Sequence, residues 1–213
     1  MQSNLHLDNR ITSAILNVQT YYKILNHCIL KTVNRDFRRL GDAEAMELNK
    51  ITFTLNGISR SLSVGDLFGQ LKPNETLIET LRERFGLTGA KLSCNDGACG
   101  CCTVLVDDIP VPSCTMLTVE ADGKKITTIE GLVSDKGDLD PLQQAFIDHY
   151  AFQCGFCTPG IIMAAKGLLL KNPHPTREEI GEALAGNFCR CISQYHVFDA
   201  IEAIAQRGGS DHE

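Results

Sequence analysis

Residues 94–108 read CNDGACGCCTVLVDD, and this stretch decides the fold of the chain. It carries four of the ten cysteines among 213 residues. Three of them, Cys94, Cys99 and Cys102, form a C-x4-C-x2-C pattern. Cys114 follows this pattern as a fourth cysteine. The residues between them are small or turn-forming, so the backbone can fold closely around a metal group and point N–H groups at it.

This spacing is typical of the plant-type ferredoxin loop, which holds a 2Fe–2S cluster. A structural zinc site, the alternative, more often shows two C-x2-C pairs. Cys101 lies beside Cys102, and only Cys102 keeps the two-residue spacing from Cys99. We therefore interpret Cys101 as a small apolar residue, with exchange of the ligand role between Cys101 and Cys102 as the alternative.

A second group of cysteines follows in QCGFCTPG (153–160) and GNFCRCIS (186–193). A C-x2-C pair and a C-x-C pair could each supply two thiolates to one four-ligand site. The spacing leaves zinc open, but C-x-C is cramped for tetrahedral zinc. A cluster in which each iron takes two thiolates accommodates it more easily, and two clusters in one chain would form an electron relay.

The composition excludes several classes of protein. The chain is 43% hydrophobic and 22% charged with a net charge of −6, and it shows no basic stripe, which makes nucleic acid a poor partner. The sequence contains no stretch of 18 apolar residues, so it predicts no membrane span. The N-terminus MQSNLHLDNR does not resemble a secretory signal, so we expect a cytoplasmic protein with reduced thiols.

The pattern before and after the first cysteine group predicts a β-grasp domain. Residues 49–64 alternate in polarity around Asn56-Gly57, which predicts a β-hairpin. Leu77, Leu81 and Phe85 predict an amphipathic helix that ends at Gly86. Two further strands are expected, at 103–106 and at 125–129.

From Pro141 onward, the spacing of apolar residues changes from the two-residue period of strands to the 3.6-residue period of helices. Pro141 and Pro159 suit first helical positions, Thr176 and Glu179 form a capping box, and the last helix is expected over Tyr195–Gln206. We therefore predict an α+β fold in which a plant-ferredoxin-like β-grasp domain precedes a four-helix bundle. Three isolated histidines are interpreted as solvated rather than ligating: His149, His174 and His196.

The predicted boundaries are an N-terminal extension at 1–46, a ferredoxin-type domain at 47–130, a helical domain at 131–208 and a tail at 209–213. Apolar residues in the extension recur at spacings of three and four from Ile11 to Ile29, which is compatible with a helical docking arm. The favoured alternative is that translation begins at Met46, directly before the first strand.

The motifs CNDGACGCCTVLVDD, QCGFCTPGIIMAAKGLL and GNFCRC closely resemble those of the small iron–sulfur subunit of the molybdenum hydroxylases. This family includes xanthine dehydrogenase, carbon monoxide dehydrogenase, aldehyde oxidoreductase and 4-hydroxybenzoyl-CoA reductase. The resemblance runs from about residue 48 to 207. Two departures are visible: Cys101 replaces the usual Ala, and Ile192-Ser193-Gln194 replaces the usual Thr-Gly-Tyr.

The resemblance implies two 2Fe–2S clusters. The cluster nearer the flavin would be held by Cys94, Cys99, Cys102 and Cys114. The cluster next to the molybdenum cofactor would be held by Cys154, Cys157, Cys189 and Cys191. Gln153 and Cys191 would also contact the pterin.

The same resemblance implies a non-catalytic electron-transfer subunit of an oxidoreductase. Partners would be a large molybdopterin-binding subunit and a medium FAD-binding subunit, and two such heterotrimers would form a dimer. A free-standing 2Fe–2S ferredoxin that carries electrons by transient binding is the alternative function. The substrate of the complex, the electron acceptor and the direction of electron flow are not readable from this chain.

Overall fold

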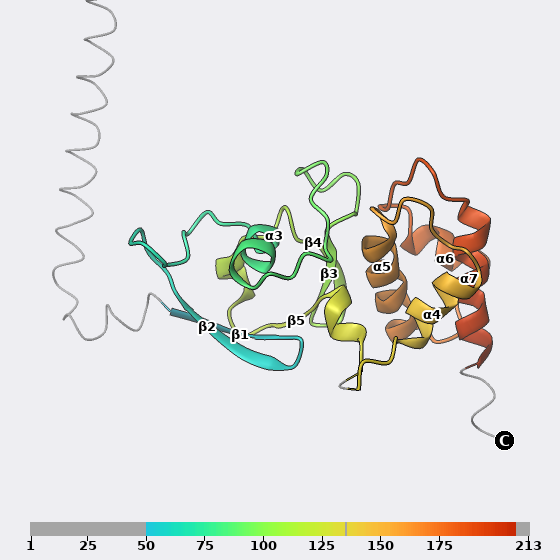
Figure 1. Cartoon of the computed structure of the whole chain (residues 1–213), viewed down its shortest axis with the longest axis horizontal. Helices are drawn as coiled ribbons and strands as arrows, with labels where there is room; N and C mark the ends of the chain where they lie inside the picture. Colours follow the sequence, from blue (N-terminus) through green and yellow to red (C-terminus); the bar gives the residue numbers. More distant parts are fainter. Residues whose placement is uncertain (1–49, 135, 208–213) are drawn as a thin grey trace, which may run out of the picture. The chain divides into compact units, whose positions relative to one another are not determined.

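A computed structural model describes residues 50–134 and 136–207 (Figure 1). One five-stranded sheet has the strand order β2-β1-β5-β3-β4. Its strands are β1 (Lys50–Leu55), β2 (Ile58–Ser63), β3 (Thr103–Val106), β4 (Ile109–Pro112) and β5 (Lys125–Thr127). Strands β1 and β5 run parallel, and the other neighbours are antiparallel. A mixed α and β fold with a ferredoxin-like sheet is thus confirmed.

Two tight turns fix the hairpins of this sheet. Asn56 and Gly57, at φ 49° and 79°, join β1 to β2 as the sequence predicts. Asp107 and Asp108, at φ 50° and 66°, join β3 to β4 in the same manner. Both pairs have the positive φ values of a type I′ turn, whose twist suits neighbouring strands.

Two strands differ from the prediction. Strand β4 was not expected, because its sequence Ile-Pro-Val-Pro lacks two N–H donors, and it fits only as the edge strand that it is. The strand expected at 125–129 ends at Thr127, because Thr128 is the N-cap residue of a short 3-10 turn over Ile129–Leu132.

The helix predicted from Leu77, Leu81 and Phe85 is present with altered geometry. It starts as α3 (Leu77–Glu79) and continues as a π-helical turn, η1 (Thr80–Arg84), before Gly86 takes φ 66°. Leu77 and Leu81 are fully buried against the sheet. The predicted helical face therefore packs as expected.

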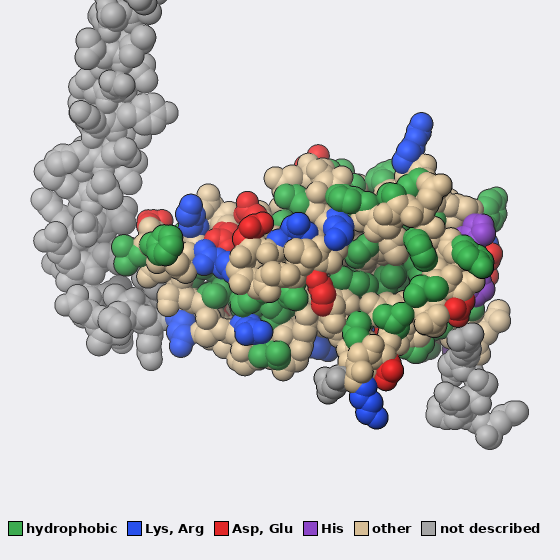
Figure 2. Space-filling view, in the orientation of Figure 1, with side chains coloured by type: hydrophobic (Ala, Val, Ile, Leu, Met, Phe, Trp, Pro, Cys, Tyr) green, Lys and Arg blue, Asp and Glu red, His purple; other side chains and the backbone are tan. Residues whose placement is uncertain are grey.

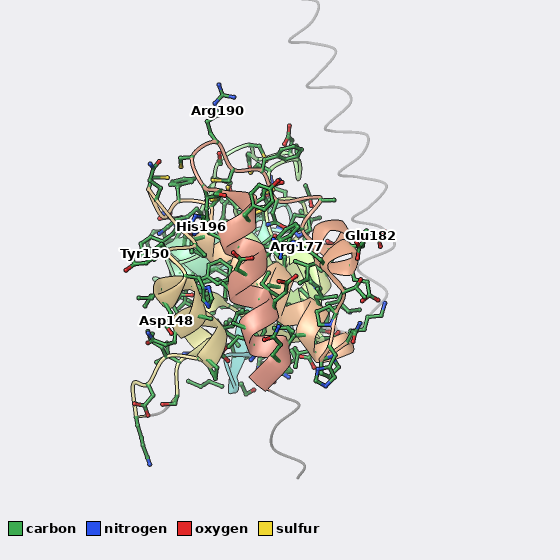
Figure 3. All side chains as sticks on the ribbon, turned by 90° about the vertical axis from the view of Figure 1, so that its right-hand side faces the viewer. Asp148, Tyr150, Arg177, Glu182, Arg190 and His196 are labelled. Atoms are coloured by element: carbon green, nitrogen blue, oxygen red, sulfur yellow. The ribbon has the colours of Figure 1, made fainter. Side chains whose placement is uncertain are left out.

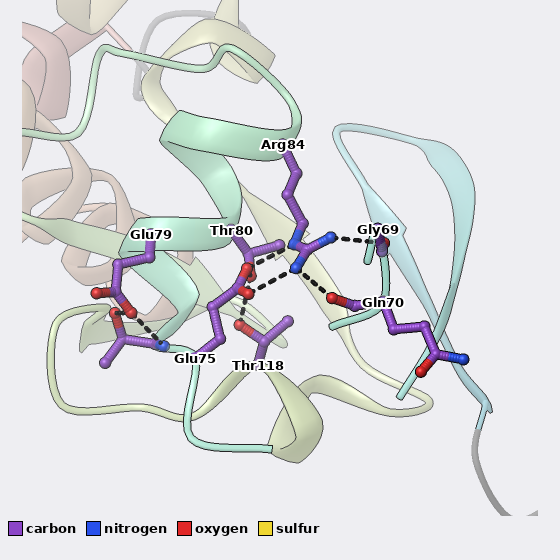
Figure 4. Close-up of polar contacts among 8 residues, drawn as sticks. Gly69, Gln70, Glu75, Glu79, Thr80, Arg84 and Thr118 are labelled. Atoms are coloured by element: carbon purple, nitrogen blue, oxygen red, sulfur yellow. Dashed lines mark hydrogen bonds and ion pairs between the residues drawn. The ribbon is translucent and has the colours of Figure 1, made fainter. Parts of the chain in front are cut away.

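An ion pair ties this helix to the loop that precedes it (Figure 4). The Arg84 guanidinium donates to both carboxylate oxygens of Glu75, at 2.6 and 2.7 Å, and to the carbonyl oxygens of Gly69 and Gln70. The Thr80 hydroxyl donates to the same carboxylate at 2.7 Å. Mainly because of the Arg84 hydrogen bonds, the pKa of Glu75 is lowered.

Four helices follow the sheet and surround a second cluster of buried side chains. They are α4 (Pro141–Asp148), α5 (Thr158–Lys171), α6 (Arg177–Ala183) and α7 (Gln194–Arg207). Each of α4 and α6 begins at a capping box, at Asp140 and Thr176. Helix α4 is shorter than its sequence pattern indicates, because Tyr150 adopts φ 53° and the Ala151 N–H bonds back to the Phe146 carbonyl.

Several predictions lie beyond what the structure tests. The N-terminal extension at 1–46 and the tail at 209–213 lie outside the described residues. The described residues group as one compact unit, and the domain boundary near residue 130 stays a prediction. Within the described ranges, no helix is long and apolar enough to cross a membrane.

The Glu75–Arg84 pair predicts a local stability effect. We expect Glu75→Gln to lower the opening free energy of residues 77–84 by about 1–3 kcal/mol at pH 7, because a partly buried guanidinium loses its charged partner. Hydrogen exchange of these amides in the intact protein measures the change. Asp108→Asn is the control, since it removes the exposed pair with Lys125 and should change stability by no more than about 0.5 kcal/mol.

The same variant has a defined pH dependence. A carboxylate whose pKa is lower in the folded state stabilises the fold above its unfolded pKa, and the contribution is lost as pH falls through the folded value. The difference between the parent protein and Glu75→Gln should therefore be full above about pH 5 and shrink below pH 4. A difference that stays constant across this range would contradict the assignment.

Candidate metal centres

The first four predicted ligands come together at the sheet end of the molecule. Cys102 and Cys114 are buried, at 2% and 5% exposure, and both belong to the core that includes β3. Burial, followed by a hydrogen bond with Cys102, raises the pKa of Cys114 to about 12, and Cys94 contributes as a neighbouring charge. Cys94 and Cys99 are half-buried. The structure thus gathers these four thiols.

The loop that carries them is shaped by positive φ angles at Asn95, Gly97 and Gly100. Its backbone is directed at the sulfurs. Burial raises the pKa of the Cys99 thiol, but backbone hydrogen bonds from Cys101 and Cys94 outweigh it and lower the pKa to about 7. The Gly97 backbone forms a similar hydrogen bond with Cys114. Such donors stabilise negative charge on sulfur, as a cluster loop requires.

Cys101 and Cys102 separate although they are adjacent in the sequence. Cys102 packs into the core around the sheet, which we call the first core. Cys101, at 5% exposure, packs with Cys157 into the core among the helices, which we call the second core. Burial raises the pKa of Cys101 to about 12, with the neighbouring Cys99 as the next cause. This placement suits the apolar role that the sequence predicts for Cys101.

The second four thiols are also brought together. The Cys191 Sγ atom lies 3.4 Å from Cys154 Sγ and 3.9 Å from Cys189 Sγ. Burial raises the pKa of Cys157 to about 12, and its hydrogen bond with Cys189 is the next cause. Cys154 and Cys191 are exposed, so this group lies at the surface.

The C-x-C loop presents backbone to one of these sulfurs. The Ile192 N–H donates to Cys189 Sγ at 3.3 Å. Burial raises the pKa of Cys189, but hydrogen bonds from Cys157 and the Ile192 backbone bring it below its usual value. Figure 3 shows the side chain of Arg190, the residue between the two cysteines in the sequence, extending away from the helices.

The two cysteine groups are joined by contacts that the sequence did not reveal. Asn187 Nδ2 donates to the Gly100 carbonyl oxygen at 3.0 Å, and the Phe188 N–H donates to the Cys99 carbonyl oxygen at 3.0 Å. A Cβ at Gly160 of α5 would lie 2.1 Å from the Gly100 oxygen. The only sequence signal was the small residue next to each cysteine motif, and it did not identify the partner.

The remaining predicted site residue, Gln153, lies at the surface, and two of the histidines interpreted as non-ligating bond to backbone oxygens. Gln153 is exposed beside the exposed Cys154. The Nδ1 atoms of His174 and His196 lie 2.8 and 2.9 Å from the carbonyl oxygens of Ala205 and His149. Next to Cys157, the buried Thr158 hydroxyl has no hydrogen-bond partner among the described residues.

The donor set fits two iron–sulfur clusters. Each group offers four cysteine thiols, and in each group backbone N–H donors reach a sulfur. The nine cysteines in the described part are free thiols. Across residues 50–134 and 136–207, no three His, Cys, Asp or Glu side chains are grouped as ligands of a single metal ion, whereas a 2Fe–2S cluster needs only two thiolates at each iron.

Comparison with protein families gives two matches. Residues 70–128 match the family described as "2Fe-2S iron-sulfur cluster binding domain". Residues 128–202 match the family described as "[2Fe-2S] binding domain". The first match includes Cys94, Cys99, Cys102 and Cys114, and the second includes Cys154, Cys157, Cys189 and Cys191.

Individual relatives agree with these matches. The chain is 45% identical over 162 residues to the nicotinate dehydrogenase small FeS subunit of Eubacterium barkeri, covering 75% of this chain and 98% of that protein. It is 46% identical to the nicotine 6-hydroxylase small subunit of Paenarthrobacter nicotinovorans, covering 71% of this chain and 87% of the relative.

Solved structures are also similar. A chain of quinoline 2-oxidoreductase from Pseudomonas putida 86 superposes with a TM-score of 0.68 at 40% identity, covering 77% of this chain and 98% of that chain. The aldehyde oxidoreductase from Desulfovibrio desulfuricans gives a TM-score of 0.69 at 37% identity, covering 76% of this chain but 18% of that chain.

The separation of Cys101 from Cys102 predicts different outcomes for two matched variants. Cys102→Ser should remove about half of the bound iron and one of two EPR signals from the reduced protein, since a ligand is lost. Cys101→Ser should keep both signals and the full iron content. Loss of one signal in Cys101→Ser, with both signals kept in Cys102→Ser, would instead assign the ligand role to Cys101, and equal loss in the two variants would contradict the apolar role of Cys101.

Proposed function

The chain belongs to the family of small iron–sulfur subunits of the molybdenum hydroxylases, and we propose that its two cysteine groups hold two 2Fe–2S clusters in series. As an iron–sulfur subunit of an oxidoreductase, it transfers electrons and does not transform substrate. The observation that carries the proposal is the gathering of eight thiols into two groups of four, joined by backbone contacts.

The proposed ligands are those named from the sequence. Cys94, Cys99, Cys102 and Cys114 would hold the cluster of the ferredoxin-like domain, and Cys154, Cys157, Cys189 and Cys191 would hold the cluster of a four-helix bundle domain formed by α4–α7. When bound, such clusters accept and release single electrons. The chain's own residues fix their positions, supply N–H donors to sulfur and set their exposure to water.

A partner is proposed at the second group, because exposed apolar residues flank its exposed cysteines in the chain. Cys154 and Cys191 are exposed, and so are nearby aromatic residues in the sequence, including Phe188 at 67% and Tyr195 at 75%. Figure 2 shows apolar side chains reaching the surface of the helical part on the face in view. Exposed apolar side chains beside a redox site suit a protein interface better than open solvent.

We assign this partner as a large molybdopterin-binding subunit, with Gln153 and Cys191 at its pterin. A medium subunit with FAD would take electrons from the first cluster, and the heterotrimer would pair into a dimer in the cytoplasm. Two relatives support separate partners, because both are named as small subunits and this chain covers 98% and 87% of them.

Purification from the natural source tests this function. We expect the chain to elute with molybdenum, flavin and two larger polypeptides, and to carry about four irons in two EPR-distinguishable clusters. A lone iron protein without molybdenum would support a mobile ferredoxin instead. A colourless protein that holds zinc would contradict both.

The placement of Gln153 predicts a selective kinetic effect. In the assembled complex, Gln153→Ala should keep both clusters and their iron but slow the reduction of the clusters by substrate, because Gln153 is proposed to contact the pterin. Rapid-mixing absorption of the clusters measures this step.

Gln144→Ala provides the matched control. This exposed glutamine on α4 donates to Asp148 and lies in the helix rather than beside the cysteines. It should leave cluster reduction unchanged. Equal rates in the Gln153 variant and the parent complex would remove Gln153 from the pterin contact.

A further inference from the structure

The loops that carry the two cysteine groups meet through backbone atoms at one place. The Cys99 carbonyl oxygen accepts a hydrogen bond of 3.0 Å from the Phe188 N–H. Phe188 directly precedes Cys189 in the chain. One hydrogen bond therefore links the residue that holds a first-group thiol to the neighbour of a second-group thiol.

The Gly100 carbonyl oxygen is held from three sides. Asn187 Nδ2 donates to it at 3.0 Å, and the Thr103 hydroxyl donates at 2.8 Å. On the third side, Gly160 of α5 approaches so closely that a Cβ there would lie 2.1 Å from this oxygen and 3.0 Å from Cys101 Cα. Gly160 has no positive φ that would require glycine, so the absence of a side chain serves the close approach.

The opposite side of the contact is equally crowded. A Cβ at Gly100 would lie 2.5 Å from Asn187 Nδ2 and 2.6 Å from the Gly186 carbonyl oxygen. The thiol of Cys101 then fills the space toward the helices, within the same apolar core as Cys157. The contact is therefore close and hydrogen-bonded, and neither glycine contributes a side chain to it.

We propose that Gly160, Gly100 and Asn187 form a spacer joint that fixes the separation of the two clusters, with the Cys99–Phe188 hydrogen bond as its direct electron route. The inference rests on the proposed function, since it requires both clusters to be present. Electron tunnelling weakens steeply with distance, so a fold that removes side chains between two redox groups favours rapid exchange between them. These three are positioning residues and hold no iron themselves.

The test is a dipolar EPR measurement of the separation between the two reduced clusters in the assembled complex. Gly160→Ala should lengthen this separation, because the new methyl group must displace either the Gly100 loop or helix α5 in a close-packed interior. Dipolar coupling should therefore fall, and electron exchange between the clusters should slow, while iron content stays that of the parent.

Two further variants make the experiment decisive. Gly181→Ala is the matched control, because its Cβ would meet only the Phe198 ring at ordinary contact distances, and the coupling should not change. Asn187→Ala removes the amide donor without adding bulk, and it should broaden the distribution of separations. It also decides the matter if Gly160→Ala fails to assemble.

The outcomes distinguish this inference from the proposed function. Two clusters in the parent complex, with coupling that neither Gly160→Ala nor Asn187→Ala alters, would overturn the spacer joint and leave the electron-transfer role in place. Fewer than two clusters in the parent complex would overturn the proposed function itself. Reduced coupling in Gly160→Ala and a broader distribution of separations in Asn187→Ala, with Gly181→Ala unchanged, would establish the joint.

Discussion

The close approach of helix α5 to the Gly100 carbonyl is the constraint on which the arrangement of both cysteine groups depends. It works because Gly160 offers no side chain and because Asn187 and Thr103 satisfy the buried oxygen. An unpaired carbonyl in the same place would cost about 1–3 kcal/mol. Close packing and hydrogen-bond satisfaction thus act at the same atom, and both are needed for the two halves to meet.

One core lies on each side of this contact, and each encloses cysteines of one group. The first is built on the sheet and encloses Cys102 and Cys114. The ion pair between Arg84 and Glu75 stabilises it further. The second is built by the helices and encloses Cys157 but leaves Cys154 exposed. Cys101 belongs to the second core although its neighbour in the chain belongs to the first, so this dipeptide connects the two.

Much of this could be predicted from the sequence, because local rules govern it. Asn56-Gly57 specifies its turn, Thr176 caps its helix, and cysteine spacing identifies both groups of thiols. Strand β4 could not be predicted from pattern alone, since its two prolines are compatible with a strand only at a sheet edge. The role of Gly160 was equally hidden, because a glycine required for close approach looks the same in sequence as one that is merely tolerated.

The unequal exposure of the two groups has a consequence for how the chain works. The potential of an iron–sulfur cluster depends on its exposure to solvent and on the hydrogen bonds to its sulfurs. Cys102 and Cys114 are already enclosed by this chain's own core, whereas Cys154 and Cys191 still face outward. A partner that covers the second group would exclude water from its sulfurs and change their electrostatic surroundings far more than those of the first. Assembly would therefore tune one end of the relay, while the other end is set by the fold of this chain.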